Sequence, residues 1–400
     1  MDSSYSSKLK NSGNEERKEE KERHASWLEL FHDLVFVAVV SQLSENLSHN
    51  ISWTGLLSFV VLFIPVWFAW LGATLFATRF GTDDLAHRVL TLLQMMGAAA
   101  MAVNVTHGLG ETSAGFALSY AAIRFLLVIE YIRVGYRMPA TKPLTRRYSI
   151  DFVVSATIWT ISAFVPPPLR FILWGVGVTI DFLTPFFIGQ LAIKFAPHAS
   201  HLPERMGLFV IIVLGESILG IVAGLAGHEW NMYSTLSVGL GLSIPFSLWW
   251  MYFDNIGGSA IRAATERGKR GIYYIWLYIH FPLVVGIAAI GIGIRQVASS
   301  NQQMFLPSSD LWLICGSVSS CLFVQALLHL VSVEDSDIKP ETKRKWAAYR
   351  IVSGIIIISI ALLNLELFPV TLMLILAFIC ALQIVLDLRD HPHHRIFRLW

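Results

Sequence analysis

The sequence predicts an all-α polytopic membrane protein with about twelve transmembrane helices. Hydrophobic residues make up 54% of its 400 residues. Charged residues make up only 14%, against roughly 25% in a soluble domain. Apolar segments recur at lengths near the ~20 residues that a helix needs to cross a bilayer. Backbone groups in lipid must be paired within their own segment, so these segments are expected to be helices.

Twelve such segments follow one another along the chain. Those of the first half span residues 27–47, 53–78, 87–107, 114–136, 149–166 and 169–190. Those of the second half span residues 205–226, 233–253, 271–295, 310–332, 346–364 and 367–387. Residues 1–26 have mixed charge and no apolar run, which predicts a disordered tail or a short solvated helix, and no cleavable signal peptide. Residues 191–204 are expected to connect the halves, and residues 388–400 to form a short tail.

The positive charges indicate how the chain is oriented. Of the 30 Lys and Arg residues, 27 fall in the two tails and in alternate loops. Only Arg170 and Arg295 fall on the other side, and Arg124 remains inside a helix. The positive-inside rule therefore predicts that both termini lie in the cytoplasm. The plasma membrane is the expected location. The sequons at Asn46 and Asn50 then face outward, and their glycosylation stays open.

The two halves have features in common. Leu30-Phe31 and Leu208-Phe209 each open a long apolar run, and the sixth segments carry Asp181 and Asp387. A six-helix unit returns the chain to its starting side, so residues 27–190 and 205–387 are predicted to be repeats of parallel topology. Chance similarity among apolar helices is the alternative.

Three charged side chains are expected near the middle of the membrane. Glu216 lies within the apolar run 204–225, Arg124 within the fourth segment and Asp181 within the sixth. An intramembrane charge is costly and commonly marks a substrate or proton pathway. We expect Arg124 to contact Asp181 or Glu216, because Arg stays charged and requires a partner. The other carboxyl is then the proton carrier, although a carboxyl that only locks helices together is the alternative.

A second polar group is expected near the cytoplasmic side. Glu29, His32 and Asp33 share one face of the first segment, because they are spaced i, i+3 and i+4. Glu130 and His280 are placed with them as the lining of a cavity open to the cytoplasm. An interfacial polar rim would explain the same pattern.

The remaining polar groups are explained by helix capping or by a position at the membrane interface. Asp83 and Asp84 precede the third segment and are expected to cap it, with a gate or an ion contact as the alternative. His198 and His201 favour an interfacial position over a metal site. No phosphate loop, dinucleotide fingerprint, HExxH helix or nucleophile elbow is present. The sequence therefore predicts neither an enzyme nor a cofactor, metal or nucleic-acid partner.

Three sequence blocks resemble the low temperature requirement protein A (LtrA) family. They are WLELFHDLVFV at 27–37, RFGTDDLAHRVLTLLQMMG at 79–97 and ERMGLFVIIVLGESI at 204–218. The family pattern more often has an aromatic residue at the position of His32. The resemblance covers about residues 27–390. It implies a multi-pass membrane protein linked by name to growth in the cold, without a settled molecular activity.

The leading functional hypothesis is a secondary transporter or permeation protein, coupled to protons, with Arg124, Asp181 and Glu216 as its intramembrane centre. Its partners would be the lipid bilayer and a small solute or proton. The alternative is a non-transporting membrane protein that senses or organises lipid. The substrate, the coupling ion, the direction and a homo-oligomeric state stay open.

Overall fold

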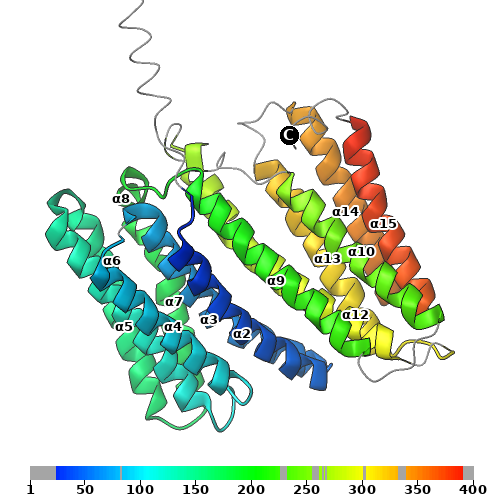
Figure 1. Cartoon of the computed structure of the whole chain (residues 1–400), viewed down its shortest axis with the longest axis horizontal. Coiled ribbons are helices and arrows are strands. Elements are labelled where there is room, and N and C mark those ends of the chain that lie inside the picture. Colours follow the sequence, from blue (N-terminus) through cyan, green and yellow to red (C-terminus); the bar gives the residue numbers. More distant parts are fainter. Residues whose placement is uncertain are drawn as a thin grey trace, which may run out of the picture.

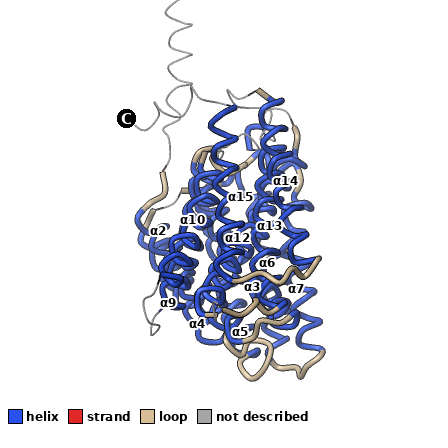
Figure 2. The backbone as a smooth tube through the Cα atoms, turned by 90° about the vertical axis from the view of Figure 1, so that its right-hand side faces the viewer, coloured by secondary structure: helices blue, strands red, loops and turns tan. Residues whose placement is uncertain are grey.

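The computed structural model describes residues 24–81, 83–225, 232–254, 261–263, 265, 268–300, 303–331 and 339–390. Of the predicted tails 1–26 and 388–400, only residues 24–26 and 388–390 are described, and residues 388–390 are the last turn of a helix. Within them the chain forms helices joined by turns and short segments, with no β-strand. Figure 2 shows the helices as one bundle of elongated rods. The prediction of an all-α polytopic membrane protein is confirmed.

The described residues include twelve helices of at least 20 residues. The first six are α2 (Trp27–His49), α3 (Trp53–Phe80), α4 (Leu85–Val105), α5 (Ser113–Arg137), α6 (Lys142–Ala163) and α7 (Leu169–Ile188). The others are α9 (His201–Leu225), α10 (Met232–Phe253), α12 (Arg270–Ser299), α13 (Ser308–Val331), α14 (Pro340–Leu362) and α15 (Pro369–Asp390). A short η1 (Pro139–Thr141) precedes α6, and a short α8 (Gln190–Lys194) follows α7.

Eleven of these helices are long and apolar enough to cross a membrane. The exception among the long helices is α6, whose first turns carry Lys142, Arg146 and Arg147. α6 nevertheless packs along α5 and α7, so it runs beside two candidate spans.

Local sequence signals explain where several helices begin and end. Ser26 and Ser52 cap α2 and α3 by accepting hydrogen bonds from the third residue inside each helix. Such caps satisfy backbone donors that the first helical turn leaves free. α3 ends at Gly81, whose φ of 56° lies in the left-handed region that glycine adopts readily.

The start of α9 differs from the sequence-based expectation. The helix begins at His201, because Pro203 falls in its first turn, where no backbone donor is needed. Arg205 therefore lies inside the helix, and Glu216 lies about two-thirds of the way along it. α6 and α14 likewise begin several residues earlier than predicted.

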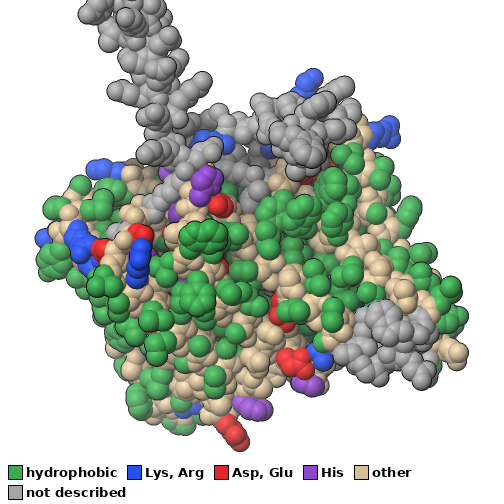
Figure 3. Space-filling model, viewed as in Figure 1, with side chains coloured by type: hydrophobic (Ala, Val, Ile, Leu, Met, Phe, Trp, Pro, Cys, Tyr) green, Lys and Arg blue, Asp and Glu red, His purple; other side chains and the backbone are tan. Residues whose placement is uncertain are grey.

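The helices form two groups that meet at the centre of the bundle. Figure 1 shows α4–α7 at one edge and α10 and α13–α15 at the other. α2 and α3 of the first half contact α9 and α12 of the second half between them. The start of α2 and the end of α15 lie on the same, upper side in Figure 1, which we call the terminal end. Most Lys and Arg side chains visible in Figure 3 lie toward the terminal end, and the surface below them is largely apolar.

Parts of the two halves have corresponding neighbours. In each half the first helix packs against the third, the third against the fourth and the fourth against the fifth. The sixth helices differ, because α7 packs mainly on α6 whereas α15 packs mainly on α10. Superposition of residues 27–190 on 205–387 by rotation about the membrane normal stays a prediction.

The orientation of the bundle can be tested by labelling introduced cysteines. The native Cys315, Cys321 and Cys380 are buried, so they should react little. If the terminal end faces the cytoplasm, an impermeant maleimide should label Glu366→Cys in intact cells and Ala140→Cys only after permeabilisation. Both positions are exposed, Glu366 in the loop after α14 and Ala140 in the short η1 after α5. The reverse labelling pattern would show that the positive-inside prediction is wrong.

Close packing of α9 against α12 depends on Gly291. A Cβ added there would lie 2.5 Å from Ser217 Cα, so the backbones would have to separate. We expect Gly291→Ala to lower the free energy of unfolding by about 1–3 kcal/mol through overpacking. Gly316→Ala is the matched control, because a Cβ at Gly316 meets nothing within 4 Å. Equal unfolding midpoints for the two variants in detergent would contradict this view of the interface.

Candidate functional site

A buried ion network joins α2 to α9 near the terminal end. Arg205 Nη2 donates to Asp33 Oδ1 at 2.6 Å, and Arg205 Nη1 donates to Glu29 Oε2 at 3.2 Å. His201 Nε2 lies 2.8 Å from the same Glu29 oxygen. Trp70 Nε1 on α3 donates to Asp33 Oδ1 at 2.8 Å. Asp33 and Arg205 are 0% and 1% exposed. We call Glu29, Asp33, His201 and Arg205 the α2/α9 network.

The register of two parallel helices produces this network. The acidic pair on α2 and the basic pair on α9 each have i, i+4 spacing, so each pair lines one face of its helix. Both helices begin at the terminal end, where Ala25 N donates to Glu204 Oε2 at 3.3 Å. Because the helices start together and run in parallel, the acidic pair meets the basic pair at the same depth.

A small cavity adjoins the α2/α9 network. Its volume of about 20 Å³ is room for a single water molecule. Its polar lining consists of Glu29, His32, His87, Thr91, Gln94, Glu130 and Arg205. Among the described residues, four buried atoms at the network have no hydrogen-bond partner: His32 Nε2, Asp33 Oδ2, His201 Nδ1 and Arg205 Nε. Buried polar atoms are normally paired, so this region is chemically suited to a water molecule or an exchanging proton.

A second network lies across this cavity, on α4 and α5. His87 Nδ1 is 2.8 Å from Glu130 Oε1, and Arg133 Nη2 donates to Glu130 Oε2 at 2.7 Å. Arg133 Nη1 also donates to Asp84 Oδ1 at 2.5 Å, and Arg137 donates to the other oxygen of Asp84. We call these five residues the α4/α5 network. Its two carboxylates match its two guanidinium groups in charge.

The neighbouring Asp83 and Asp84 have different surroundings. Asp84 caps α4 by accepting from His87 N at 2.8 Å, which confirms the capping prediction for this residue. Asp83 is exposed and accepts two hydrogen bonds from Arg88, at 2.9 and 3.0 Å. These hydrogen bonds lower the pKa of the Asp83 carboxyl. A gating role for either residue stays a prediction.

The predicted contact of Arg124 is made with Asp181. The two side chains lie 3.3 Å apart, buried between α5 and α7. The Tyr120 hydroxyl donates to Asp181 Oδ2 at 2.5 Å, and Ser155 Oγ donates to the same atom at 2.9 Å. Gly72 on α3 admits the guanidinium, since a Cβ there would lie 2.6 Å from Arg124 Nη1. We call Tyr120, Arg124, Ser155 and Asp181 the α5/α7 centre.

Glu216 lies apart from the α5/α7 centre. It is 8% exposed and lies at the interface of α9 with α2, where it interacts with Ser41 and Glu45. Its Oε2 has no hydrogen-bond partner among the described residues. The prediction of one intramembrane centre therefore needs correction, because α2 rather than α5 provides the neighbours of Glu216.

The predicted cytoplasmic group is brought together only in part. Glu29, His32 and Glu130 line the same small cavity, and Asp33 lies beside it. His280 does not line it. The His280 Nδ1 atom lies 2.6 Å from the Trp276 carbonyl, and Nε2 lies 3.1 Å from the Tyr252 hydroxyl. The placement of His280 in that cavity was therefore wrong, since its ring joins α12 to α10.

Sequence reasoning missed the contacts of two arginines, the buried Arg350 and the part-buried Arg79. Arg350 Nη2 donates to Asp387 Oδ2 at 2.6 Å, with both side chains at most 1% exposed. Arg350 falls inside the predicted segment 346–364, but its pairing with Asp387 was not predicted. Arg79 lies 5.0 Å over the ring of Tyr148 and donates to the Tyr131 hydroxyl at 3.5 Å. The partners of Arg350 and Arg79 lie on other helices, so no i, i+3 or i, i+4 spacing in the sequence indicates these contacts.

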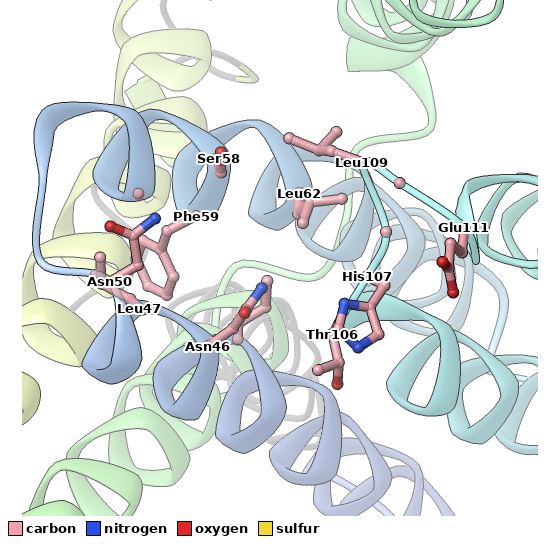
Figure 4. A pocket seen from close by; sticks show the side chains of 14 residues that line it. Asn46, Leu47, Asn50, Ser58, Phe59, Leu62, Thr106, His107, Leu109 and Glu111 are labelled. Atoms are coloured by element: carbon pink, nitrogen blue, oxygen red, sulfur yellow. The ribbon is translucent and has the colours of Figure 1, made fainter. Parts of the chain in front are cut away.

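An open pocket lies at the opposite end of the bundle. It holds about 390 Å³ between the end of α2, the start of α3 and the loop after α4. Figure 4 shows Asn46, His107 and Glu111 around it. Among the described residues, no cluster of three or more His, Cys, Asp or Glu side chains could bind a metal ion.

The three sequence blocks quoted above meet around the α2/α9 network. Residues 27–37, 79–97 and 204–218 contribute, in order, Glu29, His32 and Asp33, then His87, Thr91 and Gln94, and finally Arg205. Segments far apart in the sequence thus form one buried polar site. The fold and this site define a multi-pass α-helical membrane protein.

Comparison with known proteins then gives the family. The model of the Bacterial low temperature requirement A protein (LtrA) family matches residues 24–387, so the chain belongs to the LtrA family. The chain is also similar to "Uncharacterized protein RA0937" of Rhizobium meliloti (strain 1021). The two are 31% identical over 286 residues, which is 67% of this chain and 68% of that relative.

Proposed function

We propose that this protein is a proton-coupled secondary transporter whose α2/α9 network binds the proton. The observation that carries the proposal is the set of unpaired buried polar atoms in that network. Asp33 and the part-buried Glu29 both accept hydrogen bonds from Arg205, while Asp33 Oδ2 and His201 Nδ1 are buried without a hydrogen-bond partner among the described residues. Buried polar atoms are normally paired, so these two atoms can take up and release a proton. Chains of acidic and histidine side chains serve as proton relays in membrane transporters.

The interface of α2 with α9 supplies a second proton acceptor. Glu216 lies about 17 Å further along α9 than Arg205, from the rise of an α-helix. On α2, Asp33 and Ser41 are separated by about 12 Å on the same basis. The side chains of Phe36, Val39 and Val40 between them are fully buried. This apolar stretch would block a continuous water wire, which favours alternating access over a channel.

The α5/α7 centre has a different part in this proposal. Arg124, Tyr120 and Ser155 all bind Asp181, so this carboxylate is held in a fixed position. We assign the solute site to the region of Asp181 and Arg124, and the proton sites to Glu29, Asp33 and Glu216. An adjoining cavity of about 20 Å³ would have to widen to admit a solute.

Reconstitution tests the proposal. Purified protein in liposomes containing a pH-sensitive dye should acidify or alkalinise the lumen when a potassium diffusion potential is imposed. A solute panel, applied with and without a pH gradient, should then show which solute changes the proton flux. Proton flux equal to that of protein-free liposomes, with every solute tested, would contradict the proposal.

A non-transporting role in organising lipid is the second candidate. The observation that favours it is close packing, since the cavities beside the α2/α9 network and the α5/α7 centre each hold only about 20 Å³. This candidate predicts no proton or solute flux. It also predicts that the protein changes lipid order or phase behaviour when reconstituted.

A further inference from the structure

A groove on the outer surface runs between α5 and α6 near the terminal end. Its volume is about 410 Å³. Its apolar wall is formed by Ile132, Tyr136, Ile150, Val153 and Val154. Along α6 the lining extends from residue 142 to residue 154, or about 18 Å. The groove is therefore long and narrow, and its walls are apolar over most of that length.

The terminal end of the groove carries two positive charges. Lys142 and Arg146 are exposed and line the groove one helical turn apart. Neither forms an ion pair within the part of the chain that the structure describes. Arg147, by contrast, lies 3.4 Å from Asp151 on its own helix. The groove thus has two unneutralised cations at the level where α6 begins.

A buried hydroxyl lies between the charged and apolar parts. Ser149 lines the groove and is 7% exposed. Its Oγ has no hydrogen-bond partner among the described residues. A buried polar atom without a partner costs free energy unless a ligand or water pairs with it. Ser149 is one turn deeper than Arg146, at the depth of a lipid ester group when a phosphate binds the two cations.

We propose that this groove binds one anionic phospholipid. Lys142 and Arg146 bind its phosphate, the Ser149 hydroxyl donates to an ester carbonyl, and an acyl chain packs along Ile150 and Val154. Basic sites between transmembrane helices select anionic headgroups in this way. The inference does not depend on transport. It would hold equally for a protein that conducts nothing.

Native mass spectrometry or a lipid titration in detergent tests the proposal with phosphatidylglycerol, phosphatidylcholine and inorganic phosphate as probes. Phosphatidylglycerol should bind, and the other two should not compete with it. The double variant Lys142→Gln, Arg146→Gln should weaken that binding about 30-fold, from the usual contribution of two interfacial cations. Ser149→Ala should weaken it about two- to tenfold through the lost hydrogen bond.

The double variant Arg344→Gln, Lys345→Gln is the matched control. It removes the same charge from exposed positions on α14, at the same end of the bundle. Binding should be unchanged in this control. Equal weakening in both double variants, or equal binding of phosphatidylcholine, would overturn the proposal. Dimerisation that depends on Ile150 and is insensitive to lipid would instead assign the groove to a second copy of the chain.

Discussion

Arg205→Ala is expected to lower the free energy of unfolding by about 3–5 kcal/mol, the usual cost of breaking a buried ion pair. The variant removes the guanidinium that binds both Asp33 and Glu29, and it takes from the buried Asp33 its cationic partner. Reversible unfolding in mixed micelles would measure the loss. The exposed Arg344→Ala is the control and should unfold close to wild type.

A double-mutant cycle separates the ion pair from other effects of Arg205. The double variant Asp33→Asn, Arg205→Met should be more stable than the sum of its single variants predicts, by about 0.5–3 kcal/mol. Strict additivity of the two changes would contradict a direct interaction. A loss for Arg205→Ala no larger than that for Arg344→Ala would contradict the buried network itself.

Asp181→Ala should also lower the free energy of unfolding by about 3–5 kcal/mol, because Arg124 stays charged after its carboxylate partner is removed. The Tyr120 and Ser155 hydroxyls would lose their acceptor in the same change. Thermal unfolding in detergent measures the effect. Asp83→Ala, at an exposed carboxylate, should unfold close to wild type.

The double variant Arg124→Met, Asp181→Leu tests whether the α5/α7 centre takes part in solute transport or only stabilises the fold. Buried ion pairs are often replaced by apolar residues at little cost to stability. We expect this variant to fold and to lose solute-dependent flux while it keeps the proton exchange of the α2/α9 network. Full solute transport in the double variant would show that the pair is only structural.

The fold was largely predictable from the sequence, because apolar segments of membrane-spanning length must form helices. The start of α9 was not predictable with the same rule. Charged residues precede its apolar run, and Pro203 falls in the first turn, where proline fits. α14 begins at Pro340 and not at residue 346, because charged residues likewise precede its apolar run.

The sequence indicated most of the polar residues of the candidate site, but it indicated few of the contacts between them. Glu29, His32 and Asp33 were recognised from their common helix face, and Arg124 was correctly given Asp181 as a partner. Arg205 was not recognised as the partner of Asp33, because the packing of α2 against α9 is set by the fold and not by local spacing. Its i, i+4 relation to His201 was the available signal.

The most direct test of the central claim is proton flux in proteoliposomes carrying Glu29→Gln, Glu216→Gln or the control Glu366→Gln. Glu29 and Glu216 lie along the α2/α9 interface, whereas Glu366 is exposed in the loop before α15. If the two interface carboxyls carry the proton, each substitution should reduce flux by roughly 100-fold, as loss of a positioned proton-transfer group does. Glu366→Gln should match wild type. Wild-type flux in both Glu29→Gln and Glu216→Gln would contradict the proposal that this interface moves protons.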